Sequence, residues 1–183
     1  MNKFSFLLTF ISLFVAIGIS DLLLSFHKLL RIRTQIKWYW LLMIWAFIIL
    51  LLVLNLWFGI YHYFQLDLIN TSGGFFIFLL PIIFLLLTSF AILPDKPVPG
   101  LNLKDWYFKQ KNYIFTLLLL NLVSFSVIKV IQSGFQTLVP LSVIIALISV
   151  LIFTKKQWIH VVVSLLFLTL ICIMMLTQEM LLK

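Results

Sequence analysis

Long apolar runs alternate with short polar segments along the chain. Six of these runs approach the length that a membrane-spanning helix needs, which is about 20 mostly apolar residues. They cover residues 4–26, 38–64, 75–93, 113–131, 138–153 and 158–176. The second run is long enough to tilt or to project from a bilayer, and the fifth, with Pro140 near its start, is the shortest. The pattern predicts an all-α fold, a single polytopic transmembrane bundle of six spans with short loops.

Positively charged residues are concentrated in alternate loops of this bundle. Ten of the 13 Lys and Arg residues lie in loops one, three and five: Lys28, Arg31, Arg33, Lys37, Lys96, Lys104, Lys109, Lys111, Lys155 and Lys156. Positive loops of membrane proteins face the cytoplasm. We therefore expect these three loops in the cytoplasm and both termini outside. All ten residues except Lys96 are candidates for a basic cytoplasmic surface that contacts anionic lipid head groups or a protein partner.

The composition excludes a soluble domain. Of the 183 residues, 64% are hydrophobic and 10% are charged, whereas soluble domains carry about 25% charged residues. The net charge of +8 would suggest a nucleic-acid partner for a soluble protein. Here the basic residues flank apolar segments, so membrane topology explains them better. We expect an integral membrane protein with no nucleic-acid partner.

No pattern typical of a catalytic or metal site is present in the sequence. The five acidic residues form no pair on one span, the three histidines lack metal-ligand spacing, and there is no glycine-rich phosphate loop. The single cysteine, Cys172, cannot form an intramolecular disulfide. His27 and His160 lie at the same side of the bundle and could ligate a haem, although no other feature supports one. We expect no metal, no cofactor and no catalytic residue, which makes a membrane enzyme the least favoured class.

Asp21 is the only acidic residue inside a predicted span. Gly18, Asp21, Ser25 and Lys28 are spaced three, four and three residues apart, so they share one helix face. An ionisable residue inside a bilayer is costly and is therefore a candidate for function. The functional interpretation is a proton- or cation-binding carboxylate that lines a pathway. The alternative is a structural ion pair between Asp21 and a basic residue such as Lys28 or Arg31.

Spans two and four carry further polar residues. Asn55 and His62 lie on one broad stripe of span two, and Asn121 and Ser124 share a face of span four. These side chains could line a pathway together with Asp21 and Ser25. Hydrogen bonds between helices would explain the same residues without any ligand.

The third loop is the only sizeable one. Residues 94–100 are rich in proline and predict a stiff turn. Asn102 is then expected to cap a short helix that ends near Lys111. Its aromatic side chains suit the membrane surface, so residues 101–111 are predicted as a cytoplasmic interfacial segment that precedes span four.

Two groups of residues resemble a known set of proteins. The first group is Leu22-Leu23, Leu29-Leu30-Arg31-Ile32-Arg33, Trp38-Tyr39-Trp40 and Trp45. The second is Leu93-Pro94 followed by Trp106-Tyr107 and a basic run. Together they resemble the corresponding segments of uncharacterised bacterial six-span inner-membrane proteins of about two hundred residues. The resemblance implies a bacterial inner-membrane location and nothing about chemistry.

Two functions are compatible with these features. The favoured one is a small transporter or channel that moves an ion or small solute along a path lined by the polar helix faces. The alternative is a non-catalytic membrane subunit or scaffold whose basic surface binds a partner or anionic lipid. Either function is compatible with a homo-oligomer as well as with a monomer. One continuous cavity lined by the polar faces would favour transport, and dry packing would favour the scaffold.

Overall fold

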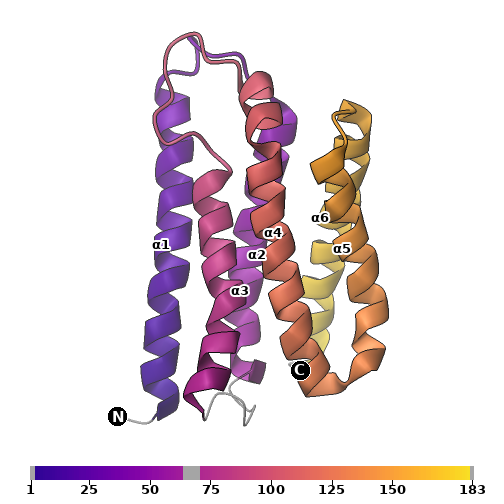
Figure 1. The fold of residues 1–183 in the computed structure, drawn as a ribbon. Helices are drawn as coiled ribbons and strands as arrows, with labels where there is room; N and C mark the ends of the chain where they lie inside the picture. The colour runs from indigo at the N-terminus through magenta and orange to yellow at the C-terminus, as the bar shows by residue number, and fades with distance from the viewer. Residues whose placement is uncertain (1–2, 64–70, 182–183) are drawn as a thin grey trace.

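The computed structural model describes residues 3–63 and 71–181 and is all-helical (Figure 1). Its elements are α1 (Lys3–Arg31), α2 (Trp40–Tyr63), α3 (Ser72–Ala91), α4 (Leu103–Ser133), the 3-10 turn η2 (Phe135–Thr137), α5 (Leu138–Phe153) and α6 (Gln157–Leu181). Five of the helices in this part of the chain, all but α5, are long and apolar enough to cross a membrane. The apolar part of α5, Leu141–Phe153, is shorter. The prediction of an all-helical bundle of apolar helices is thereby confirmed.

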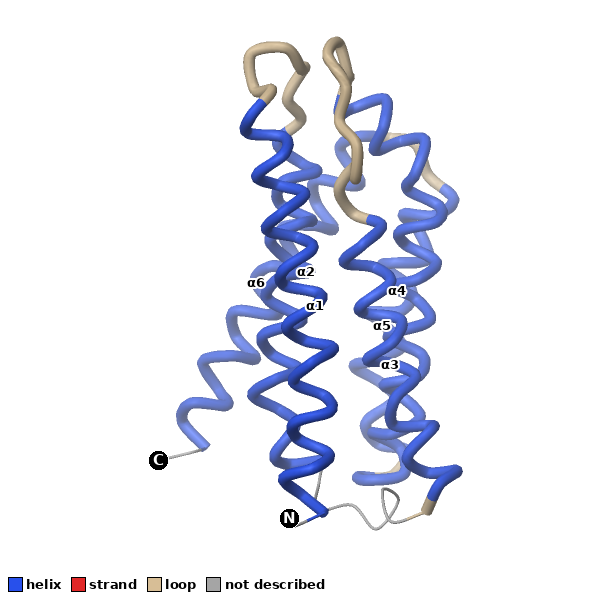
Figure 2. The backbone as a smooth tube through the Cα atoms, turned by 90° about the vertical axis from the view of Figure 1, so that its left-hand side faces the viewer, coloured by secondary structure: helices blue, strands red, loops and turns tan. Residues whose placement is uncertain are grey.

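The six helices form two layers of three (Figure 2). One layer contains α1, α2 and α6, and α2 packs against both of its neighbours. The other contains α3, α4 and α5, and α4 packs against both of its neighbours. The layers meet where α3 packs against α1 and α2 and where α5 packs against α6. The two central helices, α2 and α4, have little contact with each other, which leaves room between the layers.

The start of α4 differs from the prediction of a separate interfacial helix over 101–111. Asn102 does cap the helix, because its side chain accepts a hydrogen bond from the backbone N–H of Lys104. It also donates to the Asp105 carboxylate at 2.8 Å. The helix then continues without a break to Ser133, since no proline or glycine interrupts the sequence over that range. Gly134, with φ of 77°, ends it.

The loop before α2 and the loop after α3 are hydrogen-bonded to each other at one end of the bundle. Lys37 donates its backbone N–H to the Leu101 carbonyl at 2.9 Å and accepts from the Leu103 N–H at 3.1 Å. The Gly100 N–H donates to the Gln35 carbonyl at 2.7 Å. We call this end, formed by residues 32–39, 92–102 and 154–156, the basic end.

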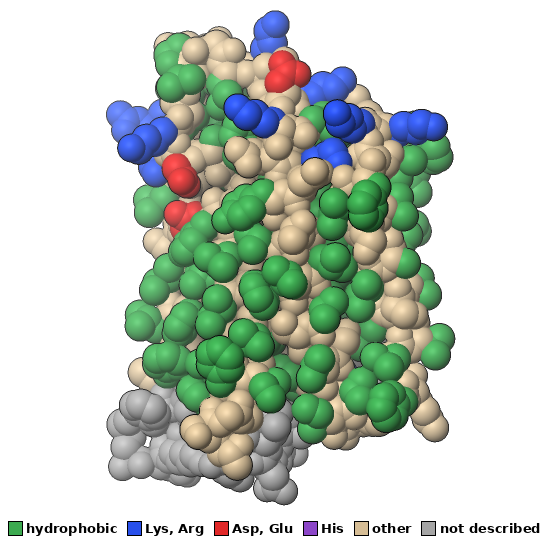
Figure 3. Space-filling view, in the orientation of Figure 1, with side chains coloured by type: hydrophobic (Ala, Val, Ile, Leu, Met, Phe, Trp, Pro, Cys, Tyr) green, Lys and Arg blue, Asp and Glu red, His purple; other side chains and the backbone are tan. Residues whose placement is uncertain are grey.

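Charge and apolar surface are separated along the bundle axis. Lys and Arg side chains gather around the basic end, and apolar side chains cover the visible flank (Figure 3). Large exposed hydrophobic residues occur on every helix, among them Leu13, Phe47, Phe76, Val127, Val143 and Leu166. Such a wide apolar surface suits contact with lipid.

Candidate functional site

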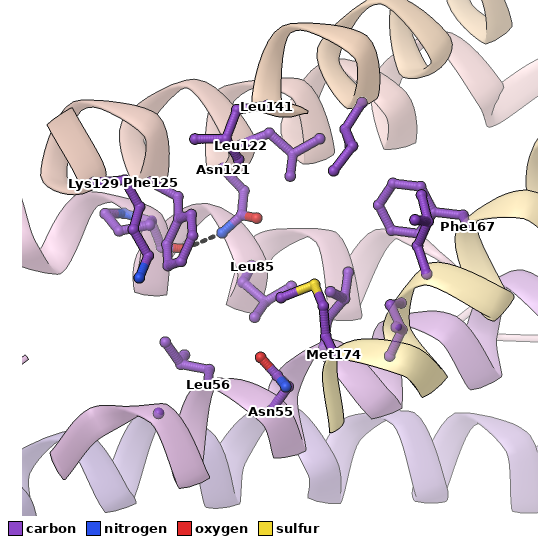
Figure 4. A pocket seen from close by; sticks show the side chains of 16 residues that line it. Asn55, Leu56, Leu85, Asn121, Leu122, Phe125, Lys129, Leu141, Phe167 and Met174 are labelled. Atoms are coloured by element: carbon purple, nitrogen blue, oxygen red, sulfur yellow. Dashed lines mark hydrogen bonds between the residues drawn. The ribbon is translucent and has the colours of Figure 1, made fainter. Parts of the chain in front are cut away.

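A cavity of about 160 Å³ lies between the two layers, and five of the six helices line it (Figure 4). On one side are residues of α2 and α6; on the other are residues of α3, α4 and α5. The lining residues of α2 are Leu52, Asn55, Leu56 and Gly59, which lie in the half of that helix farther from the basic end. The cavity therefore occupies the half of the bundle opposite the basic end.

Polar groups enter this mainly apolar cavity from both layers. Asn55 of α2 and Asn121 of α4 project from opposite walls (Figure 4). The amide of Asn121 donates to the Pro81 carbonyl at 2.7 Å, which fixes its orientation and ties α4 to α3. The cavity lining thus brings together Asn55 and Asn121, two of the residues proposed from the sequence to line a polar path.

Lys129 is a third polar group in the cavity wall. Its ammonium nitrogen lies 5.7 Å from the centre of the Phe125 ring, a distance compatible with a cation–π contact. From the sequence alone, the position of Lys129 near the end of a span indicates a side chain that extends to the lipid head groups. One feature of the sequence does point to the cavity: Lys129 lies eight residues after Asn121 and thus near the same helix face.

Aromatic side chains fill the other half of the bundle, between the cavity and the basic end. Trp45 and Phe115 are fully buried and their ring centres are 4.9 Å apart. Tyr39 packs on Tyr107, at 5.6 Å between ring centres. Phe167 of α6 contacts Trp45 and also lines the cavity, so the cluster begins where the cavity ends. This aromatic packing therefore lies between the cavity and the basic end.

A hydrogen-bonded histidine lies within the aromatic cluster. His160 is completely buried; its Nδ1 lies 2.7 Å from the Tyr107 hydroxyl and its Nε2 3.1 Å from the Thr154 carbonyl. A carbonyl can only accept, so Nε2 carries a proton, and in the neutral imidazole Nδ1 accepts from Tyr107. His27, in contrast, is exposed on α1. The two histidines therefore do not form a facing pair for haem.

Lys111 is not part of the exposed basic surface, contrary to the prediction. Its side chain is buried, and its ammonium group donates to the Leu151 carbonyl at 3.2 Å and to the Ile152 carbonyl. These carbonyls belong to the last turn of α5, where a cation is favourable. A third bond runs to the Asn112 side chain at 2.9 Å. Lys111 therefore joins α4 to α5.

The other residues proposed for the basic surface are exposed at the basic end. They are Lys28, Arg31, Arg33, Lys37, Lys104, Lys109, Lys155 and Lys156. Lys96 is exposed as well.

The remaining candidate pathway residues lie outside the cavity lining. Asp21 and Ser25 belong to α1, which contributes no residue to the cavity. Ser124 donates its hydroxyl to the Leu120 carbonyl of its own helix. The side chain of His62 lies outside the described residues. The residues of the predicted path thus lie in two places. Asn55 and Asn121 line the cavity, whereas Asp21 lies on α1, outside it.

The cavity can bind a small molecule but shows no nucleophile paired with a base. Amide groups and a lysine offer hydrogen bonds and positive charge, while leucine, isoleucine and phenylalanine side chains offer apolar contact. The described residues also contain no group of three or more His, Cys, Asp or Glu side chains placed to hold a metal ion. Comparison with protein-family models, with curated proteins and with solved structures finds no match for the chain.

Proposed function

We propose that the protein is a six-span transporter of the bacterial inner membrane that carries a small solute through the cavity between its helical layers. The observation that carries this proposal is that Asn55 and Asn121, from different layers, line one cavity, and that a buried aromatic cluster lies between this cavity and the basic end. A solute site between two helical layers, separated from one face of the membrane, fits one state of an alternating-access transporter.

The proposed topology places the basic end in the cytoplasm and both termini outside. The exposed Lys and Arg residues gathered there support this orientation. α5 would be the fifth span. At 1.5 Å per residue its length is about 24 Å, shorter than the hydrocarbon core of about 30 Å. Local thinning of the bilayer can accommodate a short span, and α5 packs between α4 and α6.

The solute would be small and neutral or anionic. A cavity of about 150 Å³ in another protein holds benzene, so this one, at about 160 Å³, suits a solute of similar size. Lys129 disfavours a cation in the cavity, and the two amides supply hydrogen bonds to a polar group. The apolar lining would hold the rest of the solute.

Transport requires the basic end to open. The hydrogen bond from Tyr107 to His160 crosses from one layer to the other, and so does the backbone pairing of Lys37 with Leu101 and Leu103. They are among the bonds that a separation of the layers at the cytoplasmic end would break, as is the bond from Gly100 to Gln35. The cavity would then become accessible from that side.

Uptake of labelled benzenesulfonate into proteoliposomes tests the proposal, because this anion, a benzene ring that carries one sulfonate group, stays charged and crosses lipid slowly on its own. We expect uptake above that of protein-free liposomes for the wild type, and loss of most of it in Asn121→Leu. Ser124→Ala, on the same helix but outside the cavity lining, is the matched control and should retain uptake. Equal uptake by wild type and Asn121→Leu would contradict a role for the cavity.

A membrane scaffold is the second candidate, and the exposed basic end favours it. Eight of the Lys and Arg residues proposed for this surface are exposed there, and such a surface attracts anionic lipids or an acidic partner. A wild-type protein that is folded in liposomes and passes no solute would favour this function over transport.

A further inference from the structure

One face of α1 packs along α3 in a register that the contacts define. The two helices run in the same direction, away from the end where α1 begins (Figure 1). Near the middle of α1, a Cβ atom at Gly18 would lie 3.3 Å from both Leu86 and Ser89. Near its end, the Lys28 ammonium group donates to the Asp95 backbone carbonyl at 3.3 Å. Asp21 and Ser25 share the face of Gly18 and Lys28, so they lie opposite residues 89–95.

Two oxygen atoms on this face are buried without a hydrogen-bond partner. They are Oδ2 of Asp21 and the hydroxyl of Ser25. Ser25 is only 1% exposed, and one helical turn separates it from Asp21, so the two side chains are neighbours. Leaving such groups unsatisfied is unfavourable, and more so for a charged group.

The groups around Asp21 and Ser25 include more hydrogen-bond acceptors than donors. The Ser89 hydroxyl donates to the Leu86 carbonyl at 2.7 Å, so its oxygen can still accept a hydrogen bond or a cation. α3 ends at Ala91, so carbonyl groups of its last turn lack donors within the helix and carry partial negative charge. The one nearby ammonium, that of Lys28, is bonded to the Asp95 carbonyl rather than to the Asp21 carboxylate. Lys28 acts on Asp21 at longer range but does not supply a hydrogen bond to its buried Oδ2 atom.

We propose that Asp21, Ser25 and the end of α3 form a binding site for a small monovalent cation, a proton or Na⁺. A carboxylate, hydroxyl groups and backbone carbonyls are the oxygen ligands that hard cations prefer. A bound cation would also satisfy both orphaned oxygens. The site is separate from the cavity, so its test does not depend on solute transport.

Lys28 and Asp95 are charged groups that lie near Asp21 and act on it. α3 contains no titratable residue, and neither do residues 40–59 of α2, which packs against α1. A change seen at Asp21 can thus be separated from the titration of other groups by replacing Asp95.

Infrared difference spectroscopy of the full-length protein in lipid nanodiscs tests the proposal, with Na⁺ and protons as the probes. For Na⁺, we expect addition of NaCl, against choline chloride, to shift the carboxylate bands. For a proton, acidification should produce a carboxylic-acid band. Either signal should disappear in Asp21→Asn and change in Ser25→Ala.

Two variants serve as controls. Ser20→Ala replaces an exposed serine of the same helix, and Asp95→Asn removes the neighbouring carboxylate; both should keep the band changes. A spectrum in which neither Na⁺ nor acidification produces a change that Asp21→Asn removes would overturn the proposal. So would a change of equal size in Ser25→Ala and wild type, because Ser25 would then not belong to the site.

Discussion

The hydroxyl of Tyr107 lies 2.7 Å from Nδ1 of His160, and this hydrogen bond joins α4 of one layer to α6 of the other. Both side chains are fully buried among aromatic rings. The bond lies between the cavity and the basic end. It is therefore placed to hold the two layers together where a path through the protein would have to open.

Replacing Tyr107 by Phe removes the hydroxyl and leaves Nδ1 of His160 without its donor. We expect the free energy of unfolding to fall by about 1–3 kcal/mol, the cost of a buried unsatisfied group. Denaturant titration in detergent micelles measures it. Tyr113→Phe is the control, because Tyr113 is exposed on the same helix and should change stability by less than about 0.5 kcal/mol. An unchanged stability in Tyr107→Phe would show that the bond does not hold the layers together.

Replacing the buried Lys111 should lower stability more than replacing the exposed Lys109. Lys111→Met keeps the apolar stem but removes the ammonium group that binds the carbonyls of Leu151 and Ile152. We expect a loss of about 1–3 kcal/mol, whereas Lys109→Met, at an exposed position, should stay within about 0.5 kcal/mol. The thermal unfolding temperatures of the two variants provide the comparison. If both variants unfold at the wild-type temperature, Lys111 does not stabilise the contact between α4 and α5.

Gly18 allows α1 to approach α3 closely. A Cβ atom there would lie 3.3 Å from side-chain atoms of Leu86 and Ser89, whereas one at Gly73 would meet nothing within 4 Å. Gly73→Ala should stabilise the protein by up to about 1 kcal/mol, since alanine favours helix over glycine. Gly18→Leu should destabilise it by about 1–3 kcal/mol through overpacking. Thermal unfolding of both variants tests this, and equal effects at the two sites would contradict the close packing of α1 on α3.

The pH dependence of Tyr39 follows from its position before α2. Burial raises the pKa of its phenol, so the folded state favours the protonated form. This contribution to stability is present below the ordinary pKa of tyrosine, about 10, and is lost as the pH rises through the higher folded value. We expect Tyr39→Phe to lose less stability than wild type between about pH 9 and pH 11. Parallel loss in both proteins would contradict burial of this hydroxyl.

Much of the helical pattern could be predicted because hydrophobic length alone determines it. The expected segment 138–153 coincides with α5, and 38–64 differs from α2 by two residues at its start and one at its end. The boundaries of α1, α4 and α6 were less accurate, and α6 continues to Leu181. α1 and α4 continue into charged sequence, to Arg31 in α1 and back to Leu103 in α4, because charged residues are compatible with a helix that leaves the apolar region.

The partners of the polar residues could not be predicted from the sequence. Which helices face each other depends on their order in space, and the chain gives no signal that α2 and α4 are the two central helices. Asn55 and Asn121 could therefore be proposed as pathway residues but not placed in one cavity. Asp21 was grouped with them by chemistry alone, although its helix packs on α3 away from the cavity. The charge pattern likewise gave no sign that Lys111 is buried.

The most direct test of the central claim determines from which side of the membrane a reagent reaches the cavity. Asn55→Cys, in a background where the exposed Cys172 is replaced by serine, places one thiol in the cavity wall. A membrane-impermeant maleimide is then applied to membrane vesicles of either orientation. We predict that it labels residue 55 faster from the side opposite the basic end, and that Tyr107→Phe speeds labelling from the basic end. Equal labelling rates from the two sides in the presence of Tyr107, or labelling from neither side, would contradict this account of the cavity.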